Sequence, residues 1–162
     1  FWQPVVPAFI ERFQLTNNSS LLDVGCAKGF MMRDIAQALP GITLQGIDIS
    51  QYALDNALPD MKPFISLGNA RKLPFKDKSF DVVISINTVH NLDLEECKMA
   101  LREIERVAKH GSFVTMDAYR TPEEKKRMDA WNLTALTYMH VDQWKALFKD
   151  VGYTGDYYWF IP

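Results

Sequence analysis

Apolar runs alternate along this chain with segments in which apolar residues recur every three or four positions. The run at 80–86 is rich in β-branched residues and nearly continuous, which is typical of a strand covered on both faces. Shorter or weaker runs predict the other strands, at 21–24, 42–48, 64–67, 112–116 and 156–161. Because helical patterns separate these runs, their order predicts βαβ units and a mostly parallel sheet.

Several helical segments begin at side chains suited to capping a helix N-terminus. Ser50 precedes a short helix, Asp93 precedes a longer amphipathic one, and Thr121 stands before a third. The helix after Asp93 is expected to end at Gly111, after a basic last turn that includes His110.

Together these elements predict an open, doubly wound α/β fold with six or seven strands and helices on both faces. We expect one domain over residues 1–162, since chains of this length usually form a single core. Its expected parts are an N-terminal helix at 1–15, a cofactor-binding core at 20–118, and substrate-side helices with a final strand at 119–162. The chain starts at Phe1 with structured sequence under way, so we expect it to be incomplete at both ends.

Composition and net charge exclude some classes of protein function for this chain. Apolar residues make up 48% of the chain, which excludes a disordered protein, and 18 basic against 20 acidic side chains give a net charge of −2. This balance offers no electrostatic footprint for nucleic acid, and no apolar stretch is long enough to span a membrane, so we expect neither as a partner. The oligomeric state stays open.

Two cysteines, Cys26 and Cys97, are far apart in the chain and match no zinc pattern. We therefore expect no metal and a reducing, cytoplasmic setting.

A glycine-containing turn after the first strand is the main chemical signal. Small residues between Asp23 and Gly29 let the backbone approach a ligand closely. Asp48 ends the second strand, where a carboxylate can accept hydrogen bonds from both hydroxyls of a ribose. The two features together predict a pocket for an adenosine-bearing cofactor. The plain alternative is that the glycines merely shape a tight turn.

The spacing of this turn bears on which cofactor it suits. A dinucleotide site needs Gly-x-Gly-x-x-Gly, whereas this chain has Gly25 and Gly29 with Ala27 between them and Met32 at the third glycine position. Asp23 would repel a phosphate and attract an ammonium group. An NAD-dependent oxidoreductase is therefore the disfavoured alternative.

At this point the sequence resembles a known family. Leu21 to Phe30 resembles the first motif of class I S-adenosylmethionine-dependent methyltransferases, although that motif usually has glycine where this chain has Ala27. The segment 46–50 resembles the second motif, and 68–70, 73–75 and 79–84 resemble the third and fourth. The similarity covers about 21–115 and is closest to the small-molecule, type 11-like branch. It implies methyl transfer from S-adenosylmethionine, leaving S-adenosylhomocysteine.

The resemblance also implies residue roles. The methionine part of the cofactor would be lined by small residues of the turn, namely Gly25, Cys26, Ala27 and Gly29. Asp23 would hold the cofactor's amino group, and Asp48 would bind the ribose. The adenine and sulfonium contacts would come from Ile49 packing on the ring, Asn69 and Ala70 at its edge, and Ile86 and Asn87 facing the sulfonium.

The sequence says less about which residues would bind the methyl acceptor. His90 follows the fourth strand, at the mouth of the expected site, and is a candidate general base; otherwise it packs under its loop. Tyr119 and Arg120 follow the fifth strand and could bind a carboxylate or phosphate of a small-molecule acceptor, or Arg120 is simply solvated. The acceptor atom, O, N or C, stays open. A third hypothesis is a non-catalytic module that binds S-adenosylmethionine.

Overall fold

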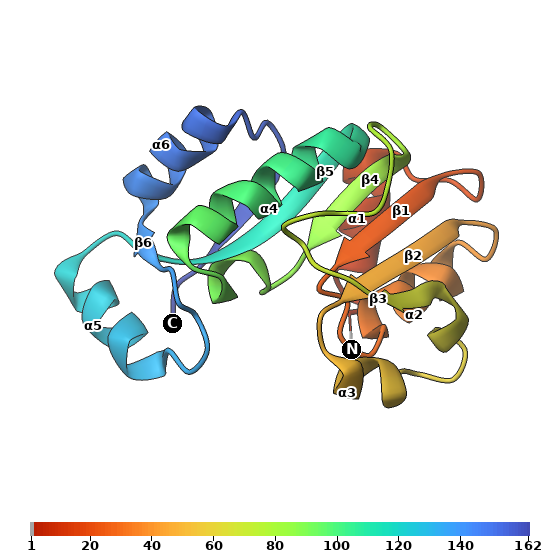
Figure 1. Cartoon of the computed structure of the whole chain (residues 1–162), viewed down its shortest axis with the longest axis horizontal. Coiled ribbons are helices and arrows are strands. Elements are labelled where there is room, and N and C mark those ends of the chain that lie inside the picture. Colours follow the sequence, from red (N-terminus) through yellow and green to blue (C-terminus); the bar gives the residue numbers. More distant parts are fainter. Residues whose placement is uncertain (1) are drawn as a thin grey trace.

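The apolar runs form six of the strands of one seven-stranded sheet (Figure 1). The computed structural model describes residues 2–162, so Phe1, the first residue of the expected N-terminal helix, lies outside it. The strands are β1 (Ser20–Val24), β2 (Thr43–Asp48), β3 (Ile65–Leu67), β4 (Phe80–Ser85), β5 (Ala108–Tyr119), β6 (Met139–His140) and β7 (Asp156–Phe160). The helices are α1 (Val6–Phe13), α2 (Phe30–Ala38), α3 (Gln51–Asp55), α4 (Leu94–Val107), α5 (Pro122–Trp131) and α6 (Val141–Val151), with short 3-10 turns η1 (Lys62–Phe64) and η2 (Val89–Asn91).

The sheet has the strand order β3-β2-β1-β4-β5-β6, and β7 pairs with β5 beside β6. All these pairings between named strands are parallel. The chain builds outward from β1 through β2 to β3, and then returns to build from β4 through β5. The strand order therefore reverses between β1 and β4, and in open α/β sheets ligands bind at the carboxyl ends of the strands at such a point. The predicted doubly wound fold is confirmed.

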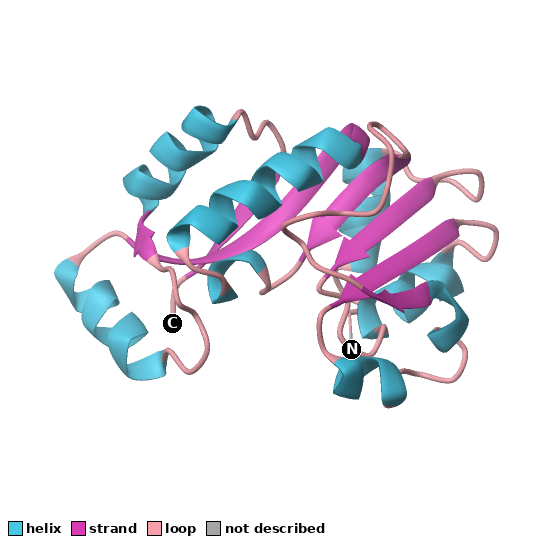
Figure 2. Ribbon diagram, viewed as in Figure 1, coloured by secondary structure: helices cyan, strands magenta, loops and turns pink. Residues whose placement is uncertain are grey.

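Helices cover both faces of the sheet (Figure 2). On one face α4 and α6 bury a cluster that includes Leu101, Ile104 and Trp144 against the sheet. On the other face α1 and α2 contribute to a second cluster, which contains Met32 and Ile35. The sheet thus separates two apolar layers, and its central strands are buried on both sides, as the continuous apolarity of 80–86 predicts.

The predicted helix starts are confirmed in atomic detail. The Ser50 hydroxyl accepts from the backbone amide of the third residue along at 3.2 Å, the Asp93 carboxylate does so at 2.9 Å, and Thr121 does so at 3.2 Å. Each cap satisfies an amide that has no partner within its helix. Local sequence is enough to place these ends.

The end of α4 differs from the prediction. The helix stops at Val107, and His110 and Gly111 belong to β5, which starts at Ala108. Gly111 pairs with Val82 of β4, and a Cβ on it would lie 3.0 Å from the ring of Phe13. The glycine therefore admits a close contact with α1 and does not cap a helix.

The region after β5 was only partly predicted. The two-residue strand β6 pairs with Ala118 and Tyr119 and carries no apolar run of its own. Before it, α5 buries Met128 and leaves most of its other side chains exposed. Within residues 2–162 no helix combines the length and apolarity that crossing a membrane requires.

Candidate functional site

The loop between β1 and α2 is held by two glycines in left-handed backbone conformations. Gly25 has φ +80° and Gly29 has φ +84°. The amides of Gly25 and Cys26 both donate to the carbonyl of Ile47, at 2.7 and 3.1 Å, and so fix the loop against β2. Gly29 occupies the N-cap position of α2, where no side chain caps the first amides of the helix. These amides are left for a ligand.

Gly25 also touches the loop that follows β4. A Cβ at this position would lie 2.0 Å from the Thr88 hydroxyl oxygen, so any side chain would have to displace Thr88. The same hydroxyl donates to the carbonyl of Ile86 at 3.0 Å and approaches that of Gly25 at 3.4 Å. The loops after β1 and β4 are therefore in direct contact across the point where the strand order reverses.

Ala27 has φ +47°, in the left-handed region that favours glycine. This explains why the related motif usually carries glycine here. The side chain is exposed, so the alanine is accommodated sterically but with backbone strain.

The Asp48 carboxylate connects the loop after β1 with the segment after β2, and the expected cofactor pocket lies between them. One oxygen accepts from the amide of Ala27 at 2.8 Å and the other from the amide of Ser50 at 2.9 Å. Each oxygen retains a further lone pair. Beside it Ile49 is 69% exposed and presents an uncovered apolar surface. The predicted ribose and adenine positions thus lie next to each other at the end of β2.

Asp23 is the unusual group of the site. It is 3% exposed, and no described residue donates a hydrogen bond to its carboxylate. Burial, with a smaller contribution from the charge of Asp48, raises the pKa of Asp23 to about 7. A buried acid with no donor and a second acid nearby is suited to a cationic ligand, so these residues fit the ammonium group of S-adenosylmethionine.

Met32 and Gly46 explain how this loop closes without a third glycine. A Cβ on Gly46 would lie 2.6 Å from the sulfur atoms of both Met32 and Cys26. The close approach of helix and sheet is thus provided by a glycine on β2. Cys26 is buried, and burial raises the pKa of its thiol, so it packs as an apolar residue.

The predicted adenine-edge residues lie in a turn after β3. The side-chain oxygen of Asn69 accepts from the backbone amide and the Nε of Arg71, at 2.9 and 3.1 Å. Its amide nitrogen carries no such contact among the described residues, and the neighbouring Ala70 is partly buried against the core. Their contact with an adenine ring stays a prediction.

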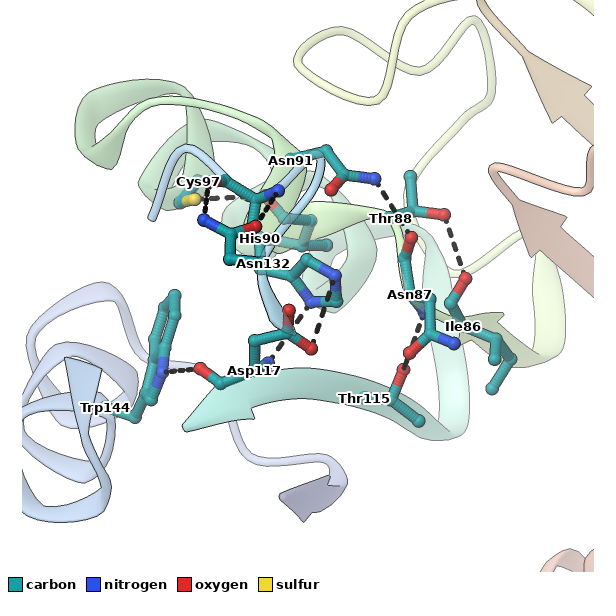
Figure 3. A network of polar contacts seen from close by, with 12 residues as sticks. Ile86, Asn87, Thr88, His90, Asn91, Cys97, Thr115, Asp117, Asn132 and Trp144 are labelled. Carbon is teal, nitrogen blue, oxygen red and sulfur yellow. Dashed lines mark hydrogen bonds and ion pairs between the residues drawn. The ribbon is translucent and has the colours of Figure 1, made fainter. Parts of the chain in front are cut away.

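A polar network joins the carboxyl ends of β4 and β5 (Figure 3). The backbone amide of Asn87 donates to the Thr115 hydroxyl at 2.6 Å, and that hydroxyl donates to the Asn87 side-chain oxygen at 2.7 Å. Asn87 itself has φ +52° and is exposed, while its carbonyl accepts from Asn91. Ile86 and Asn87 therefore stand at the carboxyl end of β4, where the strand order reverses, and their contact with the sulfonium stays a prediction.

His90 lies in η2 and is 4% exposed. Its Nδ1 accepts from the amide of Asp117 at 3.3 Å, and its Nε2 lies 3.6 Å from an oxygen of the Asp117 carboxylate (Figure 3). Burial lowers the pKa of His90, against smaller opposing effects of the Asp117 charge and a hydrogen bond to the Thr115 backbone. The histidine is thus at the acceptor side but buried, and its role as a base stays a prediction.

Tyr119 and Arg120 are less clearly placed toward an acceptor. The Tyr119 ring packs edge-on against His140 at 5.8 Å. Arg120 is exposed, and its amide and carbonyl contact Glu124 and His140. Within the described residues its guanidinium forms no ion pair, which agrees with a solvated side chain. Their substrate role stays a prediction.

Sequence reasoning missed the contacts that unite this site. Nothing in the order of residues shows that Thr88 reaches Gly25, or that Thr115 bridges to Asn87. The available signal was position, since both threonines lie where strands of a parallel sheet end. Asp117 could be placed near the pocket in the same way, but not its pairing with His90.

A cavity of about 660 Å³ lies at the opposite, amino edge of the sheet, between α1 and the start of β5. Its charges largely compensate one another, because Arg12 pairs with Asp156 and His110 lies near Asp81. It shares no residue with the site at the carboxyl edge, so we do not assign the cofactor to it.

Comparison with known proteins decides the family. Residues 22–116, more than half of the chain, match the family model of a methyltransferase domain. The chain belongs to this family, the class I S-adenosylmethionine-dependent methyltransferases. The NAD-dependent alternative is therefore abandoned.

Named relatives of this methyltransferase domain differ in what they act on. A tRNA (carboxymethyluridine(34)-5-O)-methyltransferase of Arabidopsis thaliana is 31% identical over 143 residues, covering 87% of this chain and 33% of the relative. A sterol 4-C-methyltransferase of Caenorhabditis elegans is 31% identical over 125 residues, covering 72% and 36%. The chain spans 59%, 33% and 36% of the curated relatives it matches first.

A solved structure with the same fold is the methyltransferase bound to the Trm112 activator of Haloferax volcanii. It superposes with a TM-score of 0.72 at 21% identity, covering 93% of this chain and 68% of that one. At this identity the likeness concerns the fold.

These comparisons correct the expected partners. The prediction of a small-molecule partner without nucleic acid is wrong as a general statement, because a relative is a tRNA methyltransferase and a structural neighbour binds a protein activator. Net charge was a poor basis for excluding nucleic acid, because it averages the whole surface. Nucleic acid can be held by a local patch or by another part of a longer protein.

The described side chains offer no candidate metal centre. Across residues 2–162 no three or more His, Cys, Asp or Glu side chains gather in a way that could hold a metal ion. The absence of a metal from the reaction stays a prediction.

Proposed function

We propose that this domain transfers a methyl group from S-adenosylmethionine to an acceptor bound over the carboxyl ends of β4 and β5. The observation that carries the proposal is Asp23, a buried carboxylate without a donor, in a glycine loop where the strand order reverses. A site of this kind favours a ligand with positive charge.

Residues of two loops would hold the cofactor. Gly25, Ala27 and Gly29 would leave room along its methionine part, with Asp23 beside the ammonium. Asp48 would accept from the ribose with its remaining lone pairs, and Ile49 would cover the adenine. When bound, S-adenosylmethionine supplies an electrophilic methyl group on a sulfonium, so the protein's task is to align an acceptor and exclude water.

An acceptor that is a small molecule with an apolar body has specific support. Leu133 and Leu136 are 93% and 72% exposed in the loop between α5 and β6. That loop is fixed to the site, because the amides of Leu136 and Thr137 both donate to the carbonyl of His90 at 3.0 Å. Apolar side chains beside the reaction site would suit an acceptor such as the one in the name of the sterol relative.

RNA is the second candidate acceptor. It is favoured by the tRNA methyltransferase relative, whose similarity covers 87% of this chain. Both acceptors would use the same cofactor pocket and differ in what lies over η2 and α5.

Calorimetry with the purified protein tests the cofactor half. S-adenosylmethionine should bind, NADH should not, and Asp48→Ala should weaken binding by about 2–3 kcal/mol because a charge-assisted pair of hydrogen bonds is lost. Exposed Asp55 on α3 gives a matched control, Asp55→Ala, which should bind as the parent does. Absence of binding at millimolar S-adenosylmethionine would contradict the proposal.

Transfer of a labelled methyl group tests the reaction itself. The full chain is incubated with methyl-labelled S-adenosylmethionine and either a small-molecule extract or a total tRNA fraction, and the labelled product is identified by mass. Label in the first or second fraction selects between the two acceptor classes. Binding without transfer to either fraction would favour the non-catalytic module.

A further inference from the structure

His90 and Asp117 form a buried pair on the acceptor side of the site (Figure 3). The His90 side chain is 5% exposed and that of Asp117 is 10% exposed. The two residues are far apart in the chain and come together because η2 packs against β5. The two groups differ in how much of their hydrogen-bonding capacity is already used.

The His90 ring makes its polar contacts with the end of β5. A neutral imidazole has one donor and one acceptor nitrogen, and Nδ1 acts as the acceptor for the Asp117 amide at 3.3 Å. Nε2 lies 3.6 Å from the Asp117 carboxylate, and the ring also hydrogen-bonds to the Thr115 backbone. The backbone carbonyl of His90 also holds Leu136 and Thr137, so the residue is fixed in place. The His90 ring is therefore held against the end of β5 by its contacts with Asp117 and Thr115, and little of it is open to an acceptor.

The Asp117 carboxylate, in contrast, has lone pairs to spare. Among the described residues only His90 lies near it as a polar partner, and a carboxylate has about four acceptor positions. Its main chain is anchored on both sides, since its amide donates to His90 and its carbonyl accepts from the Trp144 indole at 3.0 Å. The structure thus holds a carboxylate rigidly with open acceptor positions.

The surroundings of this carboxylate suit proton transfer. Burial raises the pKa of Asp117, and the neighbouring His90 lowers it by a smaller amount. The uncharged indole of Trp144 on α6 donates to the Asp117 carbonyl, while His140 of β6 is turned to the Arg120 carbonyl at 3.1 Å. A carboxylate whose pKa is raised toward the working pH transfers protons more effectively than an ordinary one.

We propose that Asp117 is the general base for an acceptor that bears a hydroxyl or an amine, and that His90 positions Asp117. The inference rests on the proposed methyl transfer and names the chemical class of acceptor for it. An acceptor that is already an anion needs no base, so a rigid carboxylate with open lone pairs favours alcohols, phenols or amines.

The proton and charge balance is complete without any further reactant. The acceptor lone pair forms the new bond to the methyl carbon, and the electrons of the broken carbon–sulfur bond stay on the departing thioether. The acceptor proton passes to an Asp117 oxygen and from there to water. A sulfonium and a carboxylate are thereby converted to a neutral thioether and a carboxylic acid.

Carbon NMR tests the pair without any need for turnover. The full chain is labelled at the aspartate carboxyl carbons, and the Asp117 signal is assigned by its loss in Asp117→Asn. Its midpoint should lie above the ordinary value of about 4. His90→Leu should raise it further because the polar imidazole beside the carboxylate is lost, and His90→Gln, which keeps a polar group in this place, should shift it less. An ordinary midpoint that neither variant moves would overturn the proposal.

Kinetics test the same assignment with a panel of a phenol, an aliphatic alcohol and a primary amine. Asp117→Asn should lower kcat by about 10²–10⁴-fold and remove the loss of rate at acid pH. Cofactor affinity measured by calorimetry should stay within about twofold, and exposed Asp150→Asn is the matched control. If the acid limb survives in Asp117→Asn and vanishes in His90→Gln, the base is His90 and the proposal is wrong.

The two proposals fail in different ways. If the parent protein binds S-adenosylmethionine but methylates none of the panel, the tRNA fraction or the extract, the proposed function fails. The NMR midpoint still decides whether Asp117 is held as a base by His90.

Discussion

At the scale of single residues, the cofactor loop combines required glycines with one strained alanine. Gly25 cannot carry a side chain because Thr88 occupies the space, whereas Ala27 has room for its Cβ but not a comfortable backbone. The distinction separates a steric requirement from a conformational one. A side chain added at Gly25 should therefore destabilise the protein, whereas removing the side chain of Ala27 should stabilise it.

Ala27→Gly should stabilise the protein by about 1 kcal/mol, since a left-handed φ costs alanine roughly that much and glycine almost nothing. Urea unfolding of the parent and variant measures the change. The control is Ala146→Gly at an exposed position inside α6, which should destabilise by about 1 kcal/mol. Equal losses in the two variants would contradict the strain at Ala27.

The sequence could predict the identity of the loop residues but not their environment. Asp23, Gly25 and Asp48 follow from motif spacing and from their places at the ends of strands. The missing donor to Asp23 and the engaged ring of His90 depend on packing between segments far apart in the chain. Such facts have no local signature.

At the scale of elements, helix starts were predictable and one helix end was not. An N-cap needs only a short side chain and the amides that follow it. The caps at Ser50, Asp93 and Thr121 can therefore be recognised from the sequence alone. The end of α4 is decided by β5, whose first residues pair with β4 across the sheet. A basic turn before Gly111 resembles a helix end only when this pairing is unknown.

Asp93→Ala should therefore lower the free energy of unfolding by about 1 kcal/mol, because the first turn of α4 loses its cap. Thermal or urea unfolding measures the loss. Asp93→Ser keeps an accepting oxygen and should recover most of it. If the serine variant is as unstable as the alanine variant, the cap is not what stabilises this helix start.

At the scale of the whole molecule, the topology brings the two loops of the site together. The reversal between β1 and β4 explains why residues from the first quarter of the chain meet residues from beyond its middle. The α/β alternation predicted this arrangement, and the parallel register confirms it. The acceptor side was harder to predict because β6 and the α5 connection have little sequence pattern.

The stability of the whole fold should respond to the burial of Asp23. Its pKa in the folded protein is about 7 against an ordinary 3.8, so between these values the folded state binds more protons than the unfolded state. Stability should therefore fall as pH rises through this window, and the penalty should be fully present above pH 7.

Asp23→Asn should remove that penalty and raise the free energy of unfolding at pH 8, by on the order of 2–4 kcal/mol. The gain should shrink toward zero near pH 4, where the parent carboxyl is protonated in both states. Cofactor binding should weaken in the same variant, since the ammonium loses its counter-charge. Urea unfolding at the two pH values measures the effect, and a gain that does not depend on pH would contradict it.

The contact between Thr88 and Gly25 has a consequence for anyone redesigning the acceptor pocket. Residue 88 belongs to the loop that would be varied to admit new acceptors, yet its side chain forms part of the wall behind the β1 loop. A larger side chain there would press on Gly25 and alter the donor pocket. Libraries aimed at new acceptors should therefore leave position 88 fixed and vary the exposed leucines between α5 and β6.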